Sequence, residues 1–174
     1  VKYPSNQTRT FTTETQTWPM VVRGNVAIAM NEQWTRRWRK GGAIILAEKT
    51  DNEKDIRAIS VTVPWKKGSS GHQFILVYAP TSDAKNEDER KKLRDVLRGM
   101  ISRGSIQKKF IIGRDFNAEI GGVNHTQYPK TVGRYGGTRT TDTGRQLADF
   151  CQEEELAMAG TFFQQVNRST WWHP

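Results

Sequence analysis

The residues best suited to chemistry stand in the stretch FIIGRDFNAEIGG, positions 110–122. Three apolar residues run into Gly113, and Asp115 and Asn117 follow with one phenylalanine between them. A carboxylate there can orient or deprotonate a water molecule, and a carboxamide can donate hydrogen bonds to an oxyanion or bind a metal through its oxygen. If the segment is extended, the two side chains point the same way. The pair therefore suits hydrolysis of a negatively charged ester.

Taken alone, such a triplet is more often a turn in which Asp115 and Asn117 bond their own backbone. Two other places add hydrogen-bond donors. Tyr78 stands just before Ala and Pro at the end of an apolar run, and a tyrosine hydroxyl can donate to a phosphate oxygen. Thr170 precedes two tryptophans, the first of which is Trp171, and these residues can bind phosphate and wall a pocket. For both places, ordinary packing within a strand is the alternative.

Runs of β-branched and apolar residues predict the strands that position these side chains. The run before Tyr78 is continuous, which is typical of a strand buried on both faces. A buried strand that stops at Gly113 would deliver Asp115 to the carboxyl edge of a sheet, where clefts form in α/β proteins. The predicted strands cover 21–30, 43–49, 55–65, 73–80 and 110–113, with two short closing strands in LAMAGTFF and STWW.

Two helices and two irregular segments complete the expected order. Apolar residues recur at helical spacing in 86–102, which Asn86 can cap. A second helix begins near Asp142 or Thr143 and runs to about residue 154. The polar segment 1–20 is expected to be an irregular lead-in, and the Gly- and Thr-rich segment 125–145 a long surface loop. No internal domain boundary is evident between residues 21 and 174.

The segment 31–42 mixes four cations with Trp34 and Trp38. Basic residues interleaved with aromatic residues can bind nucleic acid. The favoured interpretation is a solvated connection whose tryptophans pack inward.

The composition favours a phosphate-rich partner and a reducing compartment. The chain of 174 residues carries 27 Lys and Arg against 18 Asp and Glu, a net charge of +9. That balance suits nucleic acid, with solubility alone as the alternative. The single cysteine, Cys151, excludes an internal disulfide framework, and no apolar run approaches the roughly 18 residues of a membrane span. The ends, Val1 and TWWHP, lead us to expect a fragment of a longer protein.

In order along the chain, the blocks VYAPTS, IIGRDFNAEIG, GRQLADFC, TFF and STW resemble the endonuclease/exonuclease/phosphatase superfamily. Within it they are most similar to the apurinic-type endonuclease domain of non-LTR (LINE-like) retrotransposons. The resemblance runs from about residue 21 to residue 174 and is carried mainly by the first two blocks. It implies an incomplete α/β fold, namely a DNase I-like sandwich of two sheets with outer helices.

The resemblance also implies an activity, which is Mg²⁺- or Mn²⁺-dependent cleavage of DNA by an intracellular, nuclear enzyme. The enzyme would be a monomeric domain of a larger polyprotein. Tyr78 would contact the scissile phosphate and Asp115 would orient the attacking water. Asn117 would stabilise the transition state and lie with Asp115 near the metal, while Thr170 and Trp171 would bind phosphate and DNA.

The chain departs from the family pattern in ways that predict impaired or absent cleavage. The family's Asn-bearing strand, its metal-binding Gln-Glu block and its closing Ser-Asp-His block are not found in this sequence. Arg114 replaces the glycine that normally precedes the aspartate, and an arginine there would pair with Asp115 or contact DNA phosphate. The alternatives are a remnant that binds DNA or serves as a structural module without cleavage, and a phosphatase or RNA nuclease on the same fold.

Overall fold

The structure is a computed structural model, and it divides the chain into two compact units. Unit 1 comprises residues 1–80 and 85–116, and unit 2 comprises 81–84 and 117–174. The sequence carries no sign of this division. The residues that the structure describes are 8–12, 17–23, 26–42, 45–47, 57–64, 71–103 and 109–164.

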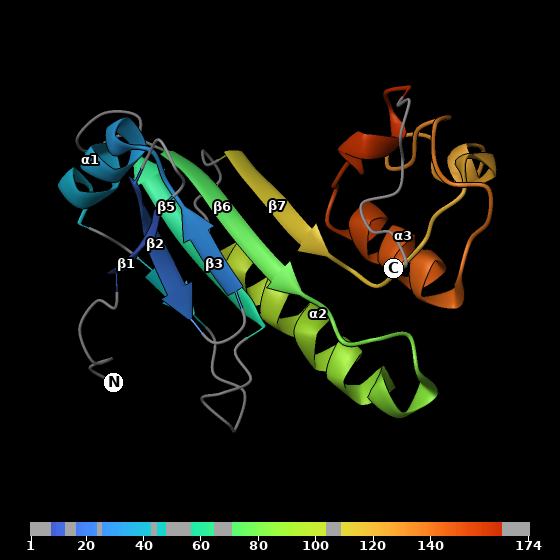
Figure 1. Ribbon diagram of the computed structural model, residues 1–174. Helices are drawn as coiled ribbons and strands as arrows, with labels where there is room; N and C mark the ends of the chain where they lie inside the picture. Colours follow the sequence, from blue (N-terminus) through green and yellow to red (C-terminus); the bar gives the residue numbers. More distant parts are fainter. Residues whose placement is uncertain are drawn as a thin grey trace. The chain divides into compact units, whose positions relative to one another are not determined.

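Unit 1 contains two sheets (Figure 1). The first is an antiparallel meander of three strands: β1 (Thr8–Thr12), β2 (Thr17–Arg23) and β3 (Val26–Ala29). The second has the strand order β4-β5-β6-β7, with β4 (Ile45–Ala47), β5 (Ala58–Pro64), β6 (Gly71–Tyr78) and β7 (Lys109–Asp115). The first two pairs of the second sheet are antiparallel, whereas β6 and β7 are parallel.

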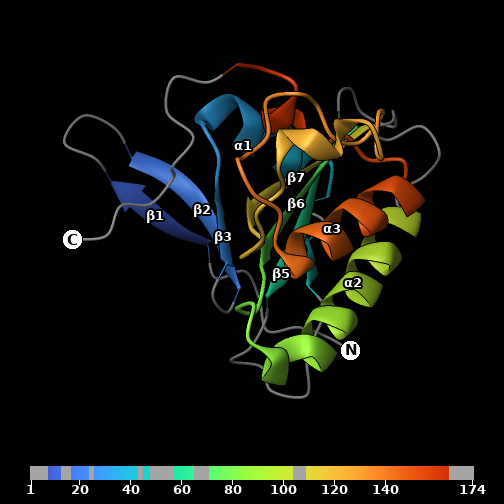
Figure 2. The same ribbon diagram turned by 90° about the vertical axis from the view of Figure 1, so that its right-hand side faces the viewer.

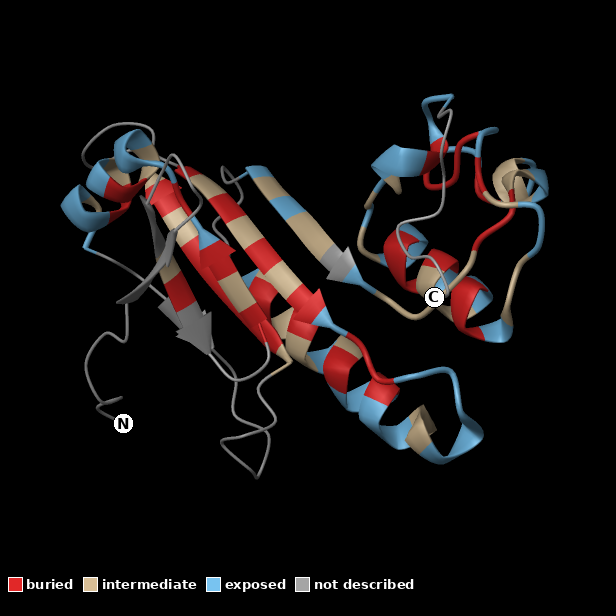
Figure 3. Ribbon diagram, viewed as in Figure 1, coloured by how far each residue is buried: buried red, intermediate tan, exposed pale blue. Residues whose placement is uncertain are grey.

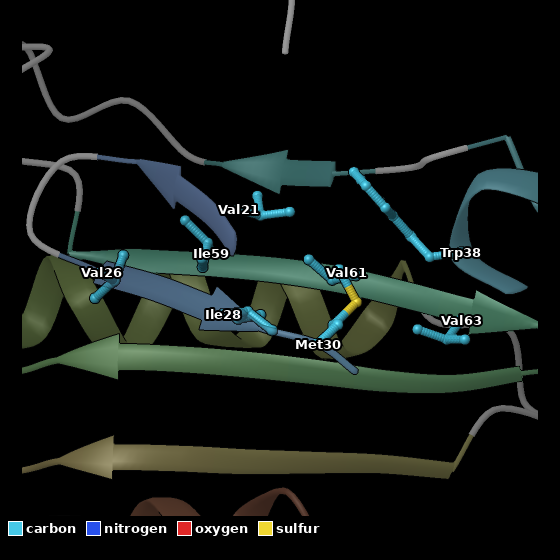
Figure 4. Close-up of a cluster of buried hydrophobic side chains, with 8 residues drawn as sticks. All are labelled: Val21, Val26, Ile28, Met30, Trp38, Ile59, Val61 and Val63. Atoms are coloured by element: carbon cyan, nitrogen blue, oxygen red, sulfur yellow. The ribbon is translucent and has the colours of Figure 1, made fainter. Parts of the chain in front are cut away.

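A hydrophobic core lies between the two sheets and the first helix, α1 (Glu32–Lys40) (Figures 2 and 4). Alternate residues of β5 face this core, as their spacing predicts, because successive side chains of a strand point to opposite faces. Trp38 of α1 is only 2% exposed. The buried members of the cluster are Val21, Val26, Ile28, Met30, Trp38, Ile59, Val61 and Val63.

The segment 31–42 is therefore a helix and not a connection. Asn31 caps α1, since its Oδ1 accepts a hydrogen bond from the Trp34 backbone N–H at 2.9 Å. The inward packing of Trp38 confirms the preferred interpretation of its tryptophans. The cations of α1 are directed away from the core: Arg36, Arg39 and Lys40 are exposed.

The second helix, α2 (Glu87–Ser102), packs on the other face of the larger sheet (Figure 2). Its predicted extent is confirmed, although Asn86 makes no side-chain capping bond. The buried Gln73 of β6 joins the two layers, because its Nε2 donates to Ser60 Oγ at 2.8 Å and to the Met100 carbonyl at 3.1 Å. The helix connects the parallel strands β6 and β7, so these three elements form a β-α-β unit.

Unit 2 is built around α3 (Asp142–Glu153), with short 3₁₀ turns before and after it. Thr141, one residue before the predicted caps, caps this helix. Phe150 and Cys151 of this helix are buried. The segment LAMAGTFF is not a strand, because residues 156–158 are irregular and Ala159–Thr161 form a 3₁₀ turn. The second predicted closing strand, STWW, lies outside the described residues.

Two further expectations need correction. The polar lead-in 1–20 contains β1 and the start of β2, so it is not wholly irregular. The strand that carries Asp115 is not buried, because β7 stands at the edge of its sheet and Ile111 is 55% exposed (Figure 3). An apolar run predicts that at least one face of a strand is packed against other elements. It does not predict whether both faces are covered.

The predicted α/β class is confirmed as a mixed fold with three α-helices and two small sheets among the described residues. A complete two-sheet sandwich with outer helices remains a prediction. None of the described helices has the length and apolarity needed to cross a membrane.

Candidate functional site

The parallel pairing of β6 with β7 brings Tyr78 and Asp115 together. In the register of this pair, Tyr78 lies directly beside Asp115 at the carboxyl ends of both strands. Paired neighbours project from the same face of a sheet, so the phenol and the carboxylate share one face of this edge. Asp115 is exposed and Tyr78 is 41% exposed, so both are accessible to a substrate. The Ala79 N–H donates to the Asp115 carbonyl at 3.0 Å, which fixes the two strand ends to each other.

A third group, Arg57, lies at the same edge and was missed by the sequence reasoning. Its guanidinium carbon is 5.9 Å from the centre of the Tyr78 ring, and its carbonyl accepts the Tyr78 N–H at 2.7 Å. Its Nη2 also donates to Glu89 Oε2 of α2 at 3.4 Å. An arginine held beside a phenol presents positive charge where an anionic group would bind. The sequence feature that could have indicated Arg57 is its position immediately before the predicted strand that becomes β5. That strand pairs with β6, which ends at Tyr78.

Asn117 does not continue the extended segment that holds Asp115. Strand β7 ends at Asp115, and Asn117 has a φ of 45°, in the left-handed region. Asparagine tolerates that region better than most residues other than glycine. The segment is therefore not extended as far as Asn117, and a common direction of the two side chains remains a prediction. The boundary between the two units also falls after Phe116, so Asp115 belongs to unit 1 and Asn117 to unit 2.

A group of threonines in unit 2 holds the loop that begins at Asn117. Thr143 Oγ1 donates to the Asn117 carbonyl at 3.2 Å. Thr141 Oγ1 accepts the Glu119 N–H at 3.1 Å, and the Thr141 N–H donates to the Glu119 carbonyl at 3.0 Å. Thr140 Oγ1 accepts the Gly121 N–H at 2.9 Å. The sequence predicted a long surface loop at Thr140 and Thr141 and a helix start near Thr143, but not that these residues attach the Asn117 segment to the start of α3.

Gly144 tests this attachment. A Cβ at Gly144 would lie 1.9 Å from the Glu119 carbonyl oxygen, so Gly144→Ala must displace the loop. We expect it to lower the free energy of unfolding by about 1–3 kcal/mol, despite the better helix propensity of alanine. Urea denaturation followed by circular dichroism measures the change. Gly113→Ala in β7 is the control, since a Cβ there has no atom within 4 Å; equal stabilities for the two variants would contradict the attachment.

Cys151 is a nucleophile that the site does not use. It is buried in α3, and burial raises the pKa of its thiol to about 12. Because the thiolate is the reactive form, we expect negligible reaction with a thiol reagent near neutral pH until the chain is unfolded in guanidinium. The reaction is followed with a disulfide reagent that releases a coloured thiolate, whose absorbance gives the rate of labelling of Cys151. Rapid stoichiometric labelling of the native chain would show that Cys151 is accessible.

The described residues do not form a metal centre. No three His, Cys, Asp or Glu side chains in the described part of the chain gather closely enough to hold an ion. The described end of β7 supplies one carboxylate, that of Asp115, whereas Mg²⁺ takes several oxygen ligands from carboxylates, water and substrate phosphates. These residues do not by themselves fit a protein-held Mg²⁺ or Mn²⁺.

Two predicted site residues, Thr170 and Trp171, lie outside the described residues. Arg114 pairs with Val77 in the register of β6 and β7, and the effect of its side chain on Asp115 remains a prediction.

The chain is similar to Craniofacial development protein 2. The proteins of that name from Tragulus javanicus and Bos taurus are each 32% identical to it over 144 residues, or 78% of this chain. The match covers 24% and 23% of the two relatives, so this chain spans about a quarter of their length. Craniofacial development protein 2 is a protein of the endonuclease/exonuclease/phosphatase superfamily, and the similarity supports a distant relationship at that level and nothing finer. No family model and no solved structure matches the chain.

Proposed function

We propose that this chain is part of a phosphodiester-hydrolysing domain of the endonuclease/exonuclease/phosphatase kind, close to the endonuclease domains of LINE-like retrotransposons, and that its substrate is DNA. The observation that carries the proposal is the register of β6 and β7, which sets Tyr78 beside Asp115 at one exposed sheet edge. The distant similarity to Craniofacial development protein 2 supports the superfamily. The net charge of +9 supports a polyanionic substrate.

Each residue at this edge has a task in the proposed reaction. The Tyr78 hydroxyl donates a hydrogen bond to a non-bridging oxygen of the scissile phosphate, and Arg57 adds positive charge on the same side. The Asp115 carboxylate orients a water molecule and accepts its proton as the water oxygen attacks phosphorus. The ester P–O bond breaks at the same time, and the leaving oxygen takes up a proton from the solvent. The carboxamide of Asn117 and the hydroxyl of Thr170 are proposed as further donors to the phosphate, with Trp171 against the DNA.

The proposed cofactor, Mg²⁺ or Mn²⁺, comes from the family and not from this donor set. A divalent ion would neutralise charge that develops on the phosphate oxygens. Since the described residues do not by themselves hold such an ion, we expect any cleavage by this chain to be impaired.

A second candidate is DNA binding without cleavage. It is favoured by the absence of an acidic metal cluster from the described ranges, combined with the strong positive charge of the chain. Binding of this kind depends on phosphate contacts, so its affinity falls steeply with salt.

Nicking of supercoiled plasmid by the purified chain, with Mg²⁺ or with EDTA, separates the two candidates. Hydrolysis predicts Mg²⁺-dependent conversion to open circles that Tyr78→Phe slows. A gel-shift assay on the same DNA at several salt concentrations measures binding independently. Salt-dependent binding with no nicking at any enzyme concentration would replace the first candidate with the second, and neither binding nor nicking would reject both.

A further inference from the structure

Arg57, Tyr78 and Asp115 are neighbours in one row across β5, β6 and β7, which lie side by side in the larger sheet (Figure 1). The pairing of β5 with β6 extends one residue beyond Ala58, because the Tyr78 N–H donates to the Arg57 carbonyl at 2.7 Å. On its other side, Tyr78 pairs with Asp115. Neighbouring strands lie about 4.8 Å apart, so the row is roughly 10 Å long. Tyr78 therefore stands between a cation and a carboxylate.

Two contacts hold the guanidinium of Arg57 at its end of the row. Its carbon is 5.9 Å from the centre of the Tyr78 ring, and its Nη2 donates to Glu89 Oε2 of α2 at 3.4 Å. The Arg57 side chain is 25% exposed, so it is packed on its neighbours and still reachable by a substrate. A guanidinium has five N–H donors and keeps its proton in proteins. Arg57 can therefore act on a phosphate ester through hydrogen bonds and charge, but not by giving up a proton.

The order of the three residues in the row has a consequence for the leaving oxygen. In phosphoryl transfer the attacking oxygen and the leaving oxygen lie roughly in line on opposite sides of phosphorus. In the proposed reaction, Asp115 orients the attacking water while Tyr78 holds a non-bridging oxygen of the same phosphate. With phosphorus at Tyr78 and the water on the Asp115 side, the leaving oxygen lies on the Arg57 side. Negative charge develops on that oxygen as its bond to phosphorus breaks.

We propose that Arg57 stabilises the leaving oxygen, which makes it a catalytic residue and not only a phosphate-binding one; this role rests on the proposed hydrolysis. The water oxygen forms a bond to phosphorus, and the proton that it loses passes to Asp115. The bond between phosphorus and the leaving oxygen breaks, and the oxygen keeps the bonding electron pair. Arg57 donates a hydrogen bond to this alkoxide, which then takes a proton from the solvent.

Two DNA substrates that differ in one bridging atom test this role. One has the natural phosphodiester, and the other has sulfur in place of the bridging oxygen that leaves, a position established from the end groups of the cleaved natural substrate. A thiolate is a much weaker base than an alkoxide and needs little help from a cation to leave. In single-turnover reactions with Mg²⁺, Arg57→Gln should slow cleavage of the natural ester about 10- to 100-fold and cleavage of the sulfur ester less than about threefold.

Three further variants separate the leaving oxygen from the rest of the phosphate. Tyr78→Phe removes a donor proposed for a non-bridging oxygen, so it should slow both esters by the same factor. Arg57→Lys keeps the positive charge and should recover part of the lost rate on the natural ester. Arg98→Gln removes a cation from α2 outside this row and should leave both rates unchanged.

The deciding quantity is the ratio of the two rates, which does not depend on how much of a variant is folded. If Arg57→Gln leaves this ratio at the value of the unchanged chain, Arg57 does not act on the leaving oxygen, although the proposed hydrolysis still stands. If the unchanged chain cleaves neither ester, the proposed hydrolysis is rejected and the role of Arg57 falls with it.

Discussion

Replacing Asp115 by asparagine is expected to lower the rate of Mg²⁺-dependent plasmid nicking by about 10²–10⁴-fold, because a carboxamide cannot take a proton from the attacking water. The register of β6 and β7 sets the Asp115 carboxylate beside Tyr78, the proposed hydrogen-bond donor to the scissile phosphate. The affinity for uncleaved plasmid should stay the same or rise slightly, since one negative charge is removed. The measurement is the initial rate of open-circle formation, with affinity followed by gel shift.

Asp95→Asn is the matched control for this prediction. Asp95 is an exposed carboxylate on α2, paired with Arg98 at 3.0 Å, and has no proposed role in the reaction. It should nick DNA at the rate of the unchanged chain. If Asp115→Asn and Asp95→Asn cleave equally fast, Asp115 does not act on the water.

The second large effect is expected for Trp38→Ala, which should lower the free energy of unfolding by about 3–5 kcal/mol. Trp38 is 2% exposed and belongs to the core that joins α1 to both sheets of unit 1. Its removal loses apolar burial and leaves a cavity that the neighbouring side chains fill only in part. Denaturant titration followed by circular dichroism measures the loss.

The neighbouring Arg39→Ala serves as comparison, because Arg39 is exposed on the same helix and should change stability by less than about 0.5 kcal/mol. The pair also decides what the aromatic residues of this segment do. A small effect of Trp38→Ala on stability, together with a large loss of DNA affinity, would reverse the conclusion that this tryptophan is a packing residue.

The types and spacing of neighbouring residues were sufficient to predict single strands and helices. The run of β-branched and apolar residues in 55–65 predicted the strand β5, and the apolar spacing of α2 predicted its length. The same reasoning placed Tyr78 and Asp115 at strand ends. It could not pair them, because the parallel register depends on contacts between strands that are distant in sequence.

The errors have a common physical origin. Whether Asn117 is extended, whether β7 is covered, and whether 159–161 form a strand or a turn all depend on neighbours that the local sequence does not specify. Helix α1 is different, since Asn31 at the cap and Trp34 and Trp38 at helical spacing were visible in the sequence. The dense positive charge of this segment led to the prediction of a solvated connection and not of a helix.

The boundary after Phe116 has a consequence for how this chain can change over evolutionary time. Asp115 is positioned by a sheet, whereas the backbone of Asn117 is held by threonines at the start of a helix in another compact unit. A substitution in the sheet therefore acts first on Asp115, and a substitution among the threonines acts first on Asn117. If both residues serve the proposed reaction, a lineage could lose the support of one residue through changes that leave the support of the other untouched.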